Sequence, residues 1–118
     1  MRNKNIFNLK EKKVSLAIKE FVNRLLEIDK DKIKSIRLYG SVVQGRYKSG
    51  ESDIDLLVVG EDSEIDNDIL DLETQISLKY GVMLSVLFAT PEELKLTEEM
   101  GYPFIKEINK GEVLYECL

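Results

Sequence analysis

Hydrophobic residues recur at spacings of three and four in two long segments of the chain. In residues 14–28 and 64–80 this spacing predicts amphipathic helices that pack one face on a core. Gly81 directly follows the second segment, as is typical of a carboxyl-terminal helix cap. The periodic positions are Val14, Ala17, Ile18, Phe21, Leu25 and Ile28 in the first segment, and Ile65, Ile69, Leu72, Ile76 and Tyr80 in the second.

The first predicted helix has a wider apolar surface than one packed face needs. Leu16, Val22 and Leu26 lie beside the periodic positions and extend the hydrophobic stripe. Two interpretations are open. Either these residues belong to the core, or the helix contacts a second protein, which would be a partner or another copy of the chain.

Shorter apolar runs predict strands. Residues 35–40 alternate apolar and polar positions, whereas residues 53–60 form a nearly continuous apolar run that ends at Gly60. Such a run is typical of a central strand covered on both faces. Residues 82–89 and 112–116 predict two further strands.

The second half of the chain also carries a helix-start signal. Thr90 is a candidate N-cap, Pro91 suits the first turn, and Glu93 stands at the capping-box position. Residues 102–111 predict one more helix. Helices and strands that alternate in this way predict a small α/β (α+β) fold with a mixed central sheet and helices packed against it. We expect one domain over residues 1–118, since no repeat or linker divides the chain.

Composition excludes several kinds of chemistry. The chain has no histidine, so Ser-His-Asp triads and imidazole metal sites are excluded and carboxylates are the expected metal ligands. Cys117 is the only cysteine, which excludes an internal disulfide. The polar start "MRNKNIFNLKEKK" does not resemble a secretory signal, and the apolar runs are too short for a membrane span. We therefore expect a cytoplasmic protein that does not enter membranes.

The net charge of −5 is unevenly distributed. Residues 1–37 hold 11 Lys/Arg against 5 Asp/Glu, whereas residues 38–118 hold 6 against 17. The acidic body argues against binding to a long nucleic acid, which needs many phosphate contacts. The basic segment is either a solvated helix face or a surface for an acidic partner.

The stretch "YGSVVQGRYKSGESDIDLL", residues 39–57, holds the candidate chemistry. Gly40 and Ser41 follow a predicted strand, and "SVVQGRY" can start a helix. Unpaired backbone N–H groups at a helix start can bind a phosphate, and the serine hydroxyl can add another donor. The alternative is a plain N-cap serine after a turn glycine.

Asp53 and Asp55 stand two residues apart at the beginning of the predicted central strand. Side chains at this spacing point to the same face of a sheet, so the two carboxylates lie side by side. They repel each other unless a cation lies between them, and Mg²⁺ binds through one or two carboxylates together with substrate phosphates. The alternative is that Asp53 caps a turn and Asp55 lies at a wet sheet edge.

Residues 40–59, "GSVVQGRYKSGESDIDLLVV", resemble the Gly-Ser-x-x-x-Gly…Ser-Asp-Ile-Asp-Leu motif of minimal nucleotidyltransferases. These belong to the DNA polymerase β-like nucleotidyltransferase superfamily. The resemblance extends more weakly over most of the chain. The residues that match the motif are Gly40, Ser41, Gly45, Ser52, Asp53, Ile54, Asp55 and Leu56.

The resemblance implies a reaction. Family members transfer a nucleoside monophosphate from a nucleoside triphosphate to an acceptor hydroxyl, here most simply AMP from ATP, with Mg²⁺ or Mn²⁺ as cofactor. It implies that Asp53 and Asp55 are catalytic and hold the metal. Arg46 and Lys48 either neutralise the triphosphate or are ordinary surface charges. The candidate phosphate-binding residues are Gly40, Ser41, Gly45, Arg46, Lys48 and Ser52.

The resemblance also implies a third carboxylate on a later strand, facing the first two. Residues 82–89 contain no acid, and Ser85 stands at the expected position. Glu73 on the preceding helix either substitutes for it or stays in solvent. A chain without this acid is either an enzyme or a nucleotide-binding module that acts by binding a partner.

The resemblance suggests a partner as well. Many minimal nucleotidyltransferases work beside a helical HEPN-domain protein, as the antitoxin of a toxin–antitoxin pair. We therefore expect a HEPN-type partner protein or a homodimer, in addition to the nucleoside triphosphate.

Overall fold

The computed structural model of this protein describes residues 11–61 and 63–117; the polar start of the chain, residues 1–10, lies outside the described residues. A four-stranded sheet in the order β3-β2-β1-β4 forms the centre. β1 pairs antiparallel with β2 and with β4, and β2 pairs parallel with β3, so the predicted mixed sheet is confirmed. The strands are β1 Ile33–Tyr39, β2 Ile54–Gly60, β3 Leu84–Ala89 and β4 Glu112–Glu116.

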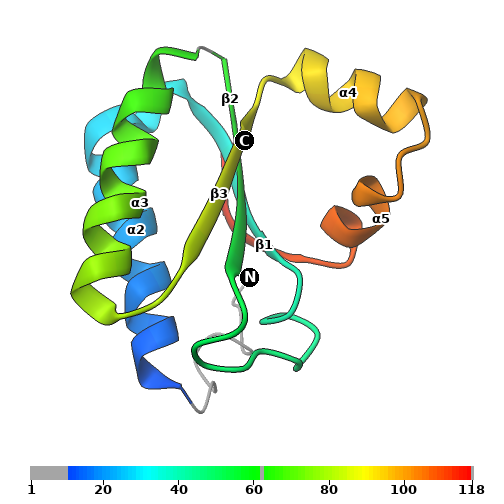
Figure 1. Ribbon diagram of the computed structural model, residues 1–118. Helices are drawn as coiled ribbons and strands as arrows, with labels where there is room; N and C mark the ends of the chain where they lie inside the picture. Colours follow the sequence, from blue (N-terminus) through cyan, green and yellow to red (C-terminus); the bar gives the residue numbers. More distant parts are fainter. Residues whose placement is uncertain (1–10, 62, 118) are drawn as a thin grey trace.

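Helices lie on both sides of this sheet. α2 and α3 cover one face side by side, and α4 and α5 lie across the other (Figure 1). None of the helices among the described residues is both long and apolar enough to cross a bilayer. The α-helices are α2 Lys12–Asp29, α3 Asp66–Tyr80, α4 Pro91–Glu99 and α5 Phe104–Asn109, with short 3₁₀ helices η1 Lys30–Lys32 and η2 Ser63–Ile65.

The predicted helix boundaries are confirmed at two places. Gly81 ends α3 in the left-handed conformation, with φ of 66°. Thr90 begins α4 with a full capping box: its hydroxyl accepts the N–H of Glu93, and the Glu93 carboxylate accepts the N–H of Thr90. The local sequence was sufficient to predict the end of α3 and the start of α4.

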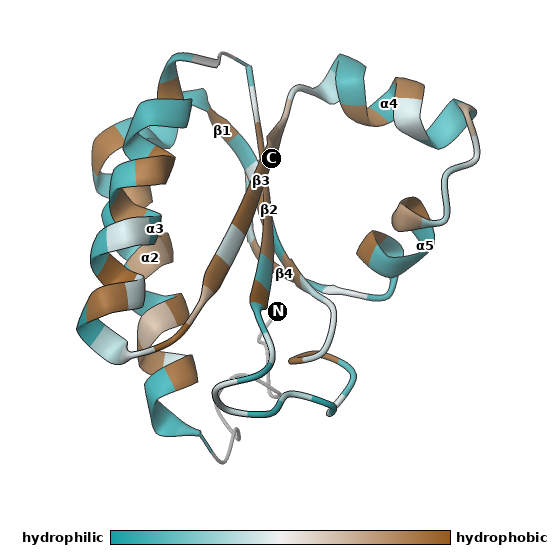
Figure 2. Ribbon diagram, viewed as in Figure 1, coloured by the Kyte–Doolittle hydropathy of each residue, from teal (hydrophilic) through white to brown (hydrophobic). Residues whose placement is uncertain are grey.

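The larger core lies between the sheet and the α2–α3 layer. In Figure 2 β2 is mostly hydrophobic, and hydrophobic residues alternate with hydrophilic ones along α2 and α3. Residues of both helices and of β1, β2 and β3 make up this core. Val22 and Leu26 pack against this core, whereas Leu16 is 50% exposed. The wide apolar surface of α2 is therefore mostly core.

A smaller apolar cluster fixes α5 to the opposite face. It consists of Tyr39, Leu57, Val59 and Ile108, with Phe104 packed against it. The rings of Tyr39 and Phe104 meet edge to face, with centroids 5.6 Å apart. α4 buries none of its residues, so α5 is the better anchored of the two helices on this side.

β2 is the central strand that the sequence predicts, since it lies between β1 and β3 and is buried along almost its whole length. Ile54, Leu56 and Val58 belong to the larger core. Successive side chains of a strand point to opposite faces, so Asp55 shares the α5 face with Leu57 and Val59. The fold therefore places the Asp55 side chain on the face opposite α2 and α3.

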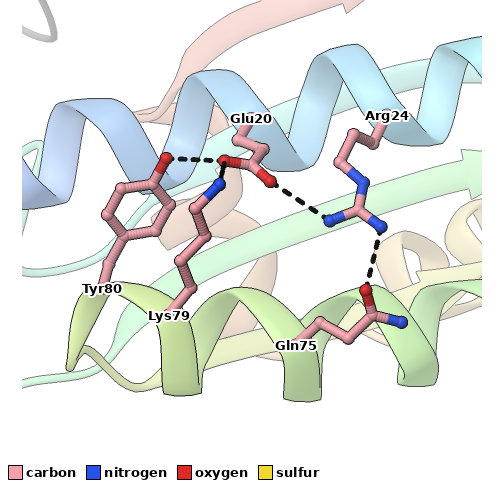
Figure 3. Close-up of polar contacts among 5 residues, drawn as sticks. All are labelled: Glu20, Arg24, Gln75, Lys79 and Tyr80. Atoms are coloured by element: carbon pink, nitrogen blue, oxygen red, sulfur yellow. Dashed lines mark hydrogen bonds and ion pairs between the residues drawn. The ribbon is translucent and has the colours of Figure 1, made fainter.

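A polar clamp centred on Glu20 joins α2 to α3 (Figure 3). One carboxylate oxygen accepts hydrogen bonds from Lys79 at 2.8 Å and from the Tyr80 hydroxyl at 2.6 Å. The other oxygen binds Arg24 at 3.1 Å, and Arg24 also donates to Gln75 at 2.9 Å. The hydrogen bonds from Lys79 and Tyr80 lower the pKa of Glu20 from 4.5 to about 2.

We expect Glu20→Gln to lower stability at pH 7, because the ionised form of Glu20 is the form that the clamp stabilises. The folded-state pKa of about 2 lies below the ordinary value of 4.5. The contribution is thus fully present above the ordinary value and is lost as the pH falls through about 2. Denaturant unfolding at pH 7 and at about pH 3 should show a smaller difference between variant and wild type at the lower pH.

Glu61→Gln is a matched control for this prediction. It removes the ion pair between Glu61 and Lys34, which joins side chains that are 58% and 48% exposed. Exposed pairs contribute about 0–1 kcal/mol, so this variant should unfold nearly as the wild type does. Equal losses in the two variants at pH 7 would contradict a special contribution from the clamp.

Candidate active site

The pairing of β1 with β2 brings the two halves of the candidate motif together. Tyr39, the last residue of β1, stands opposite Asp55 near the beginning of β2. The turn that follows β1 therefore lies at the same end of the sheet as the residues that precede β2. The hydroxyl of Ser41 donates to the backbone oxygen of Asp53 at 3.4 Å, a direct link between the two segments.

Gly40 is required where it stands, for two reasons. Its φ is +81°, in the left-handed region that favours glycine. A Cβ atom built on Gly40 would collide with Oδ2 of Asp55. The Asp55 carboxylate thus lies against the backbone of the Gly40–Ser41 turn, so a ligand of that carboxylate would also adjoin the turn.

The segment after Gly40 is one helical turn and not the predicted start of a helix. The N–H of Gln44 donates to Gly40 O at 3.1 Å, but the N–H of Arg46 donates back to Ser41 O at 2.8 Å. Gly45, with φ of +74°, permits this closure, which is a Schellman arrangement. Val42 is buried in the larger core and anchors the turn.

The two aspartates differ in environment. Asp53 is exposed, whereas Asp55 is half-buried. Burial, and then the neighbouring charge of Asp53, raise the pKa of Asp55 above its ordinary value. Burial and the charge of Asp55 also raise the pKa of Tyr39 to about 12. In the described part of the chain, no lysine or arginine forms an ion pair with either aspartate.

This donor set suits a hard divalent cation. Asp55 lies in the central strand β2 and not at a sheet edge, so the wet-edge alternative is wrong. A cation between the carboxylates would offset both the burial and the mutual repulsion that raise the pKa of Asp55. The residues present therefore fit Mg²⁺ or Mn²⁺.

The loop between turn and strand holds the other candidate residues. Ser52 accepts the N–H of Lys48 at 2.9 Å, so its hydroxyl closes the loop. Lys48 has an exposed side chain. The guanidinium of Arg46 donates through Nε and Nη2 to the side-chain oxygen of Gln44. Gly40 and Ser41 thus make non-covalent contacts with the aspartates. The Ser52 hydroxyl instead binds the backbone of Lys48, within the loop.

Comparison with known proteins identifies the family. A family model described as the nucleotidyltransferase domain matches residues 18–115. The chain belongs to this nucleotidyltransferase family. A Methanocaldococcus jannaschii protein named as a candidate protein adenylyltransferase is 42% identical over 101 residues, which cover 84% of this chain and 95% of that protein. A second one from the same organism is 34% identical over 71 residues, or 58% of this chain and 71% of that protein.

Solved structures share the fold. A candidate minimal nucleotidyltransferase matches with a TM-score of 0.57 and 18% identity, covering 92% of this chain and 97% of that chain. A toxin–antitoxin crystal structure with AMP-PNP matches with a TM-score of 0.56 and 21% identity, covering 92% of this chain and 75% of that chain. The predicted resemblance and fold class are therefore confirmed.

For this nucleotidyltransferase the position of Ser85 is informative. Ser85 pairs in register with Asp55 on the neighbouring strand β3, so their side chains share a face. A hydroxyl thus stands beside Asp55 at the position where the family resemblance implies an acid. Across the described residues, no cluster of three acidic or cysteine side chains has the arrangement of a metal site.

Glu73 does not take the place of that acid. It lies on α3, which packs on the face opposite Asp55, and its Oε2 accepts the N–H of Val86 at 2.9 Å. This bond satisfies a backbone donor of the edge strand β3. Glu73 is half-buried, so the interpretation as a solvated helix residue is also incomplete.

Sequence reasoning missed one contact of the nucleotidyltransferase turn. Gln44 donates through Nε2 to Oε1 of Glu107 at 2.8 Å. Gln44 lies inside the recognised motif, which is a signal that could have drawn attention to it. Glu107 is 63 residues away on α5, and no local pattern marks it.

We expect Gly40→Ala to destabilise the protein more than Gly45→Ala. Both glycines have positive φ, so each substitution costs about 1 kcal/mol of backbone strain. Only Gly40 adds a collision with Asp55, which raises its total cost to about 2–4 kcal/mol. The Cβ at Gly45 would meet no atom within 4 Å. Denaturant unfolding of both variants measures the difference.

An Asp55→Ala background tests the cause. There Gly40→Ala should cost little more than Gly45→Ala, because the carboxylate is gone. A cost of Gly40→Ala that is the same in both backgrounds would disprove the close approach.

Proposed function

We propose that this nucleotidyltransferase transfers an adenylyl group from Mg²⁺-bound ATP to a hydroxyl of a partner protein. The hydroxyl oxygen forms a bond to the α-phosphorus as the bond to the bridging oxygen breaks, so pyrophosphate leaves and the hydroxyl proton is released. The observation that carries the proposal is the contact between the Gly40–Ser41 turn and the Asp53–Asp55 pair, in a chain of the nucleotidyltransferase family. A turn that can bind phosphate and an adjoining pair of carboxylates suit a metal-bound triphosphate.

Each part of the site has a distinct task in this proposal. The backbone N–H groups after Gly40 and the Ser41 hydroxyl bind the terminal phosphates, and Gly40 allows their close approach. Asp53 and Asp55 hold the divalent metal, which when bound neutralises charge on the reacting phosphate and its leaving group. Arg46 and Lys48 supply positive charge along the triphosphate. Catalysis then depends on positioning and on charge stabilisation.

The choice of adenylyl group and of a protein acceptor rests on relatives. Two Methanocaldococcus jannaschii proteins with 42% and 34% identity are named as candidate protein adenylyltransferases. Toxin–antitoxin complexes are among the structures of similar fold, one of them with AMP-PNP. We propose that the partner is a helical HEPN-type protein and that this chain acts as its antitoxin.

A second candidate function is a nucleotide-binding module that acts by contact with its partner. The observation that favours it is Ser85 beside Asp55, where a carboxylate would complete the metal site. A serine hydroxyl is a weak base and a poor ligand for a hard metal. In both candidates the Gly40–Ser41 turn and the two aspartates bind the nucleotide, so they differ only in whether transfer follows.

We expect Asp53→Asn/Asp55→Asn to abolish Mg²⁺-dependent binding of AMP-PNP, measured by calorimetry with and without Mg²⁺. Transfer of labelled AMP from ATP should fall by about 100-fold or more, because charge stabilisation is lost. A matched control, Glu27→Gln/Asp71→Asn, removes two exposed charges from α2 and α3 on the other side of the sheet. The control should bind and react as the wild type does. Binding that is indifferent to Mg²⁺ and to both aspartates would refute the proposed site.

We expect Ser85→Asp to separate the enzyme from the binding module. A third carboxylate beside Asp55 adds repulsion in metal-free buffer, so the Tm should fall with a chelator present and recover with Mg²⁺. If the missing acid limits the chemistry, adenylyl transfer should rise by about tenfold or more. Thr74→Asp, which adds an acid at an exposed position of α3, is the control. It should change neither the Tm nor the rate of adenylyl transfer. A wild type that transfers AMP faster than Ser85→Asp would show that this enzyme does not need the acid.

A further inference from the structure

We propose that Glu107 of α5 is a positioning residue which, through Gln44, holds Arg46 in place for the triphosphate. This inference rests on the proposed nucleotide site and adds a residue outside the recognised motif. The observed chain of contacts runs from Glu107 Oε1 to Gln44 Nε2 at 2.8 Å, and from Gln44 Oε1 to Arg46 Nε at 3.0 Å and to Arg46 Nη2.

The chemistry of the three groups sets the direction of this relay. An ionised carboxylate only accepts hydrogen bonds, and a guanidinium only donates them. The amide of Gln44 can therefore satisfy both neighbours in a single orientation, with its NH₂ toward Glu107 and its oxygen toward Arg46. Glu107 thus determines which end of the Gln44 amide faces the arginine.

α5 is a suitable anchor for such a relay. Phe104 packs edge to face on Tyr39, and Ile108 is buried in the same cluster. A Cβ built on Gly111, just after α5, would collide with the backbone oxygen of Leu38, so this junction lies tightly against β1. Glu107 therefore reaches Gln44 of the turn from a helix that is packed against β1.

Arg46 is the member of the relay that can meet a phosphate. Its backbone N–H donates to Ser41 O at 2.8 Å, so it belongs to the same turn as the candidate phosphate seat. Its side chain is exposed, and an exposed arginine loses much rotamer freedom when it binds an anion. Because Gln44 already fixes Nε and Nη2, part of that ordering precedes binding, and Nη1 has no hydrogen bond to the relay.

Two variants of Glu107 isolate the hydrogen bond from the charge. Glu107→Ala and Glu107→Gln lose the same negative charge, but only glutamine can still accept the Gln44 NH₂. Calorimetry with Mg²⁺·AMP-PNP should show binding about threefold to tenfold weaker for Glu107→Ala, the loss of one hydrogen bond, and within about twofold of wild type for Glu107→Gln. Asn109→Ala, at an exposed position of the same helix, should match the wild type.

Two further measurements separate positioning from a merely structural role. AMP lacks the terminal phosphates, so its binding should change by less than about twofold in Glu107→Ala. In an Arg46→Ala background, Glu107→Ala should weaken Mg²⁺·AMP-PNP no further, since the relay ends at Arg46. If Glu107→Ala does not fold, Gln44→Ala interrupts the same relay and should give the same loss.

The outcomes also distinguish this inference from the proposed function. Wild-type protein that does not bind Mg²⁺·AMP-PNP would overturn both. Wild-type binding with equal affinities for Glu107→Ala and Glu107→Gln would overturn the relay alone. An effect of Glu107→Ala that persists in the Arg46→Ala background, or that extends equally to AMP, would also overturn it.

Discussion

The antiparallel pairing of β1 with β2, with Tyr39 opposite Asp55, is the constraint on which the rest of the site depends. It places the end of one strand beside the beginning of the next, so the turn after β1 lies against the carboxylate of Asp55 in β2. The pairing also makes Gly40 obligatory, because Asp55 occupies the space that a side chain there would need. α2 and α3 pack on one face of this pair of strands, and α5 packs on the face that carries Asp55.

Glu20 and Asp55 differ in how their surroundings affect the ionised carboxylate. Glu20 lies among hydrogen-bond donors of α2 and α3, which lower its pKa to about 2. Asp55 lies near another acid in a partly buried position, and its pKa is raised. The first arrangement stabilises the ionised side chain, whereas the second disfavours it. Asp29 at the end of α2 has a raised pKa of the same origin, about 6, so for Asp55 the position against the Gly40–Ser41 turn carries the argument and the pKa only agrees with it.

The sequence predicted those features that depend on local chemistry. Asp55 lies in β2 as the sequence predicts, whereas Asp53 precedes the strand, so the shared face of the two carboxylates stays a prediction. Ser85, the position at which the resemblance implies an acid, pairs in register with Asp55. The predicted helix after Ser41 was wrong, because Gly45 closes a single turn in the left-handed conformation. Glu107 could not be predicted, since its contact with Gln44 depends on how α5 docks against β1.

In the proposed site, the residues for phosphate binding and the position beside the acceptor lie on opposite sides of β2. Asp55 lies on β2, with β1 on one side and β3 on the other. The turn and the hydrogen-bonded chain Arg46–Gln44–Glu107, which we propose to act on the phosphates, follow β1. Ser85 lies on the β3 side, where the implied third carboxylate would act on the acceptor. In the proposed site, a serine on β3 in place of an acid would therefore remove charge beside the acceptor and would leave the phosphate-binding residues unchanged. If the proposed function holds, this arrangement would let the chain bind its nucleotide while the rate of transfer depends on which groups reach the β3 side.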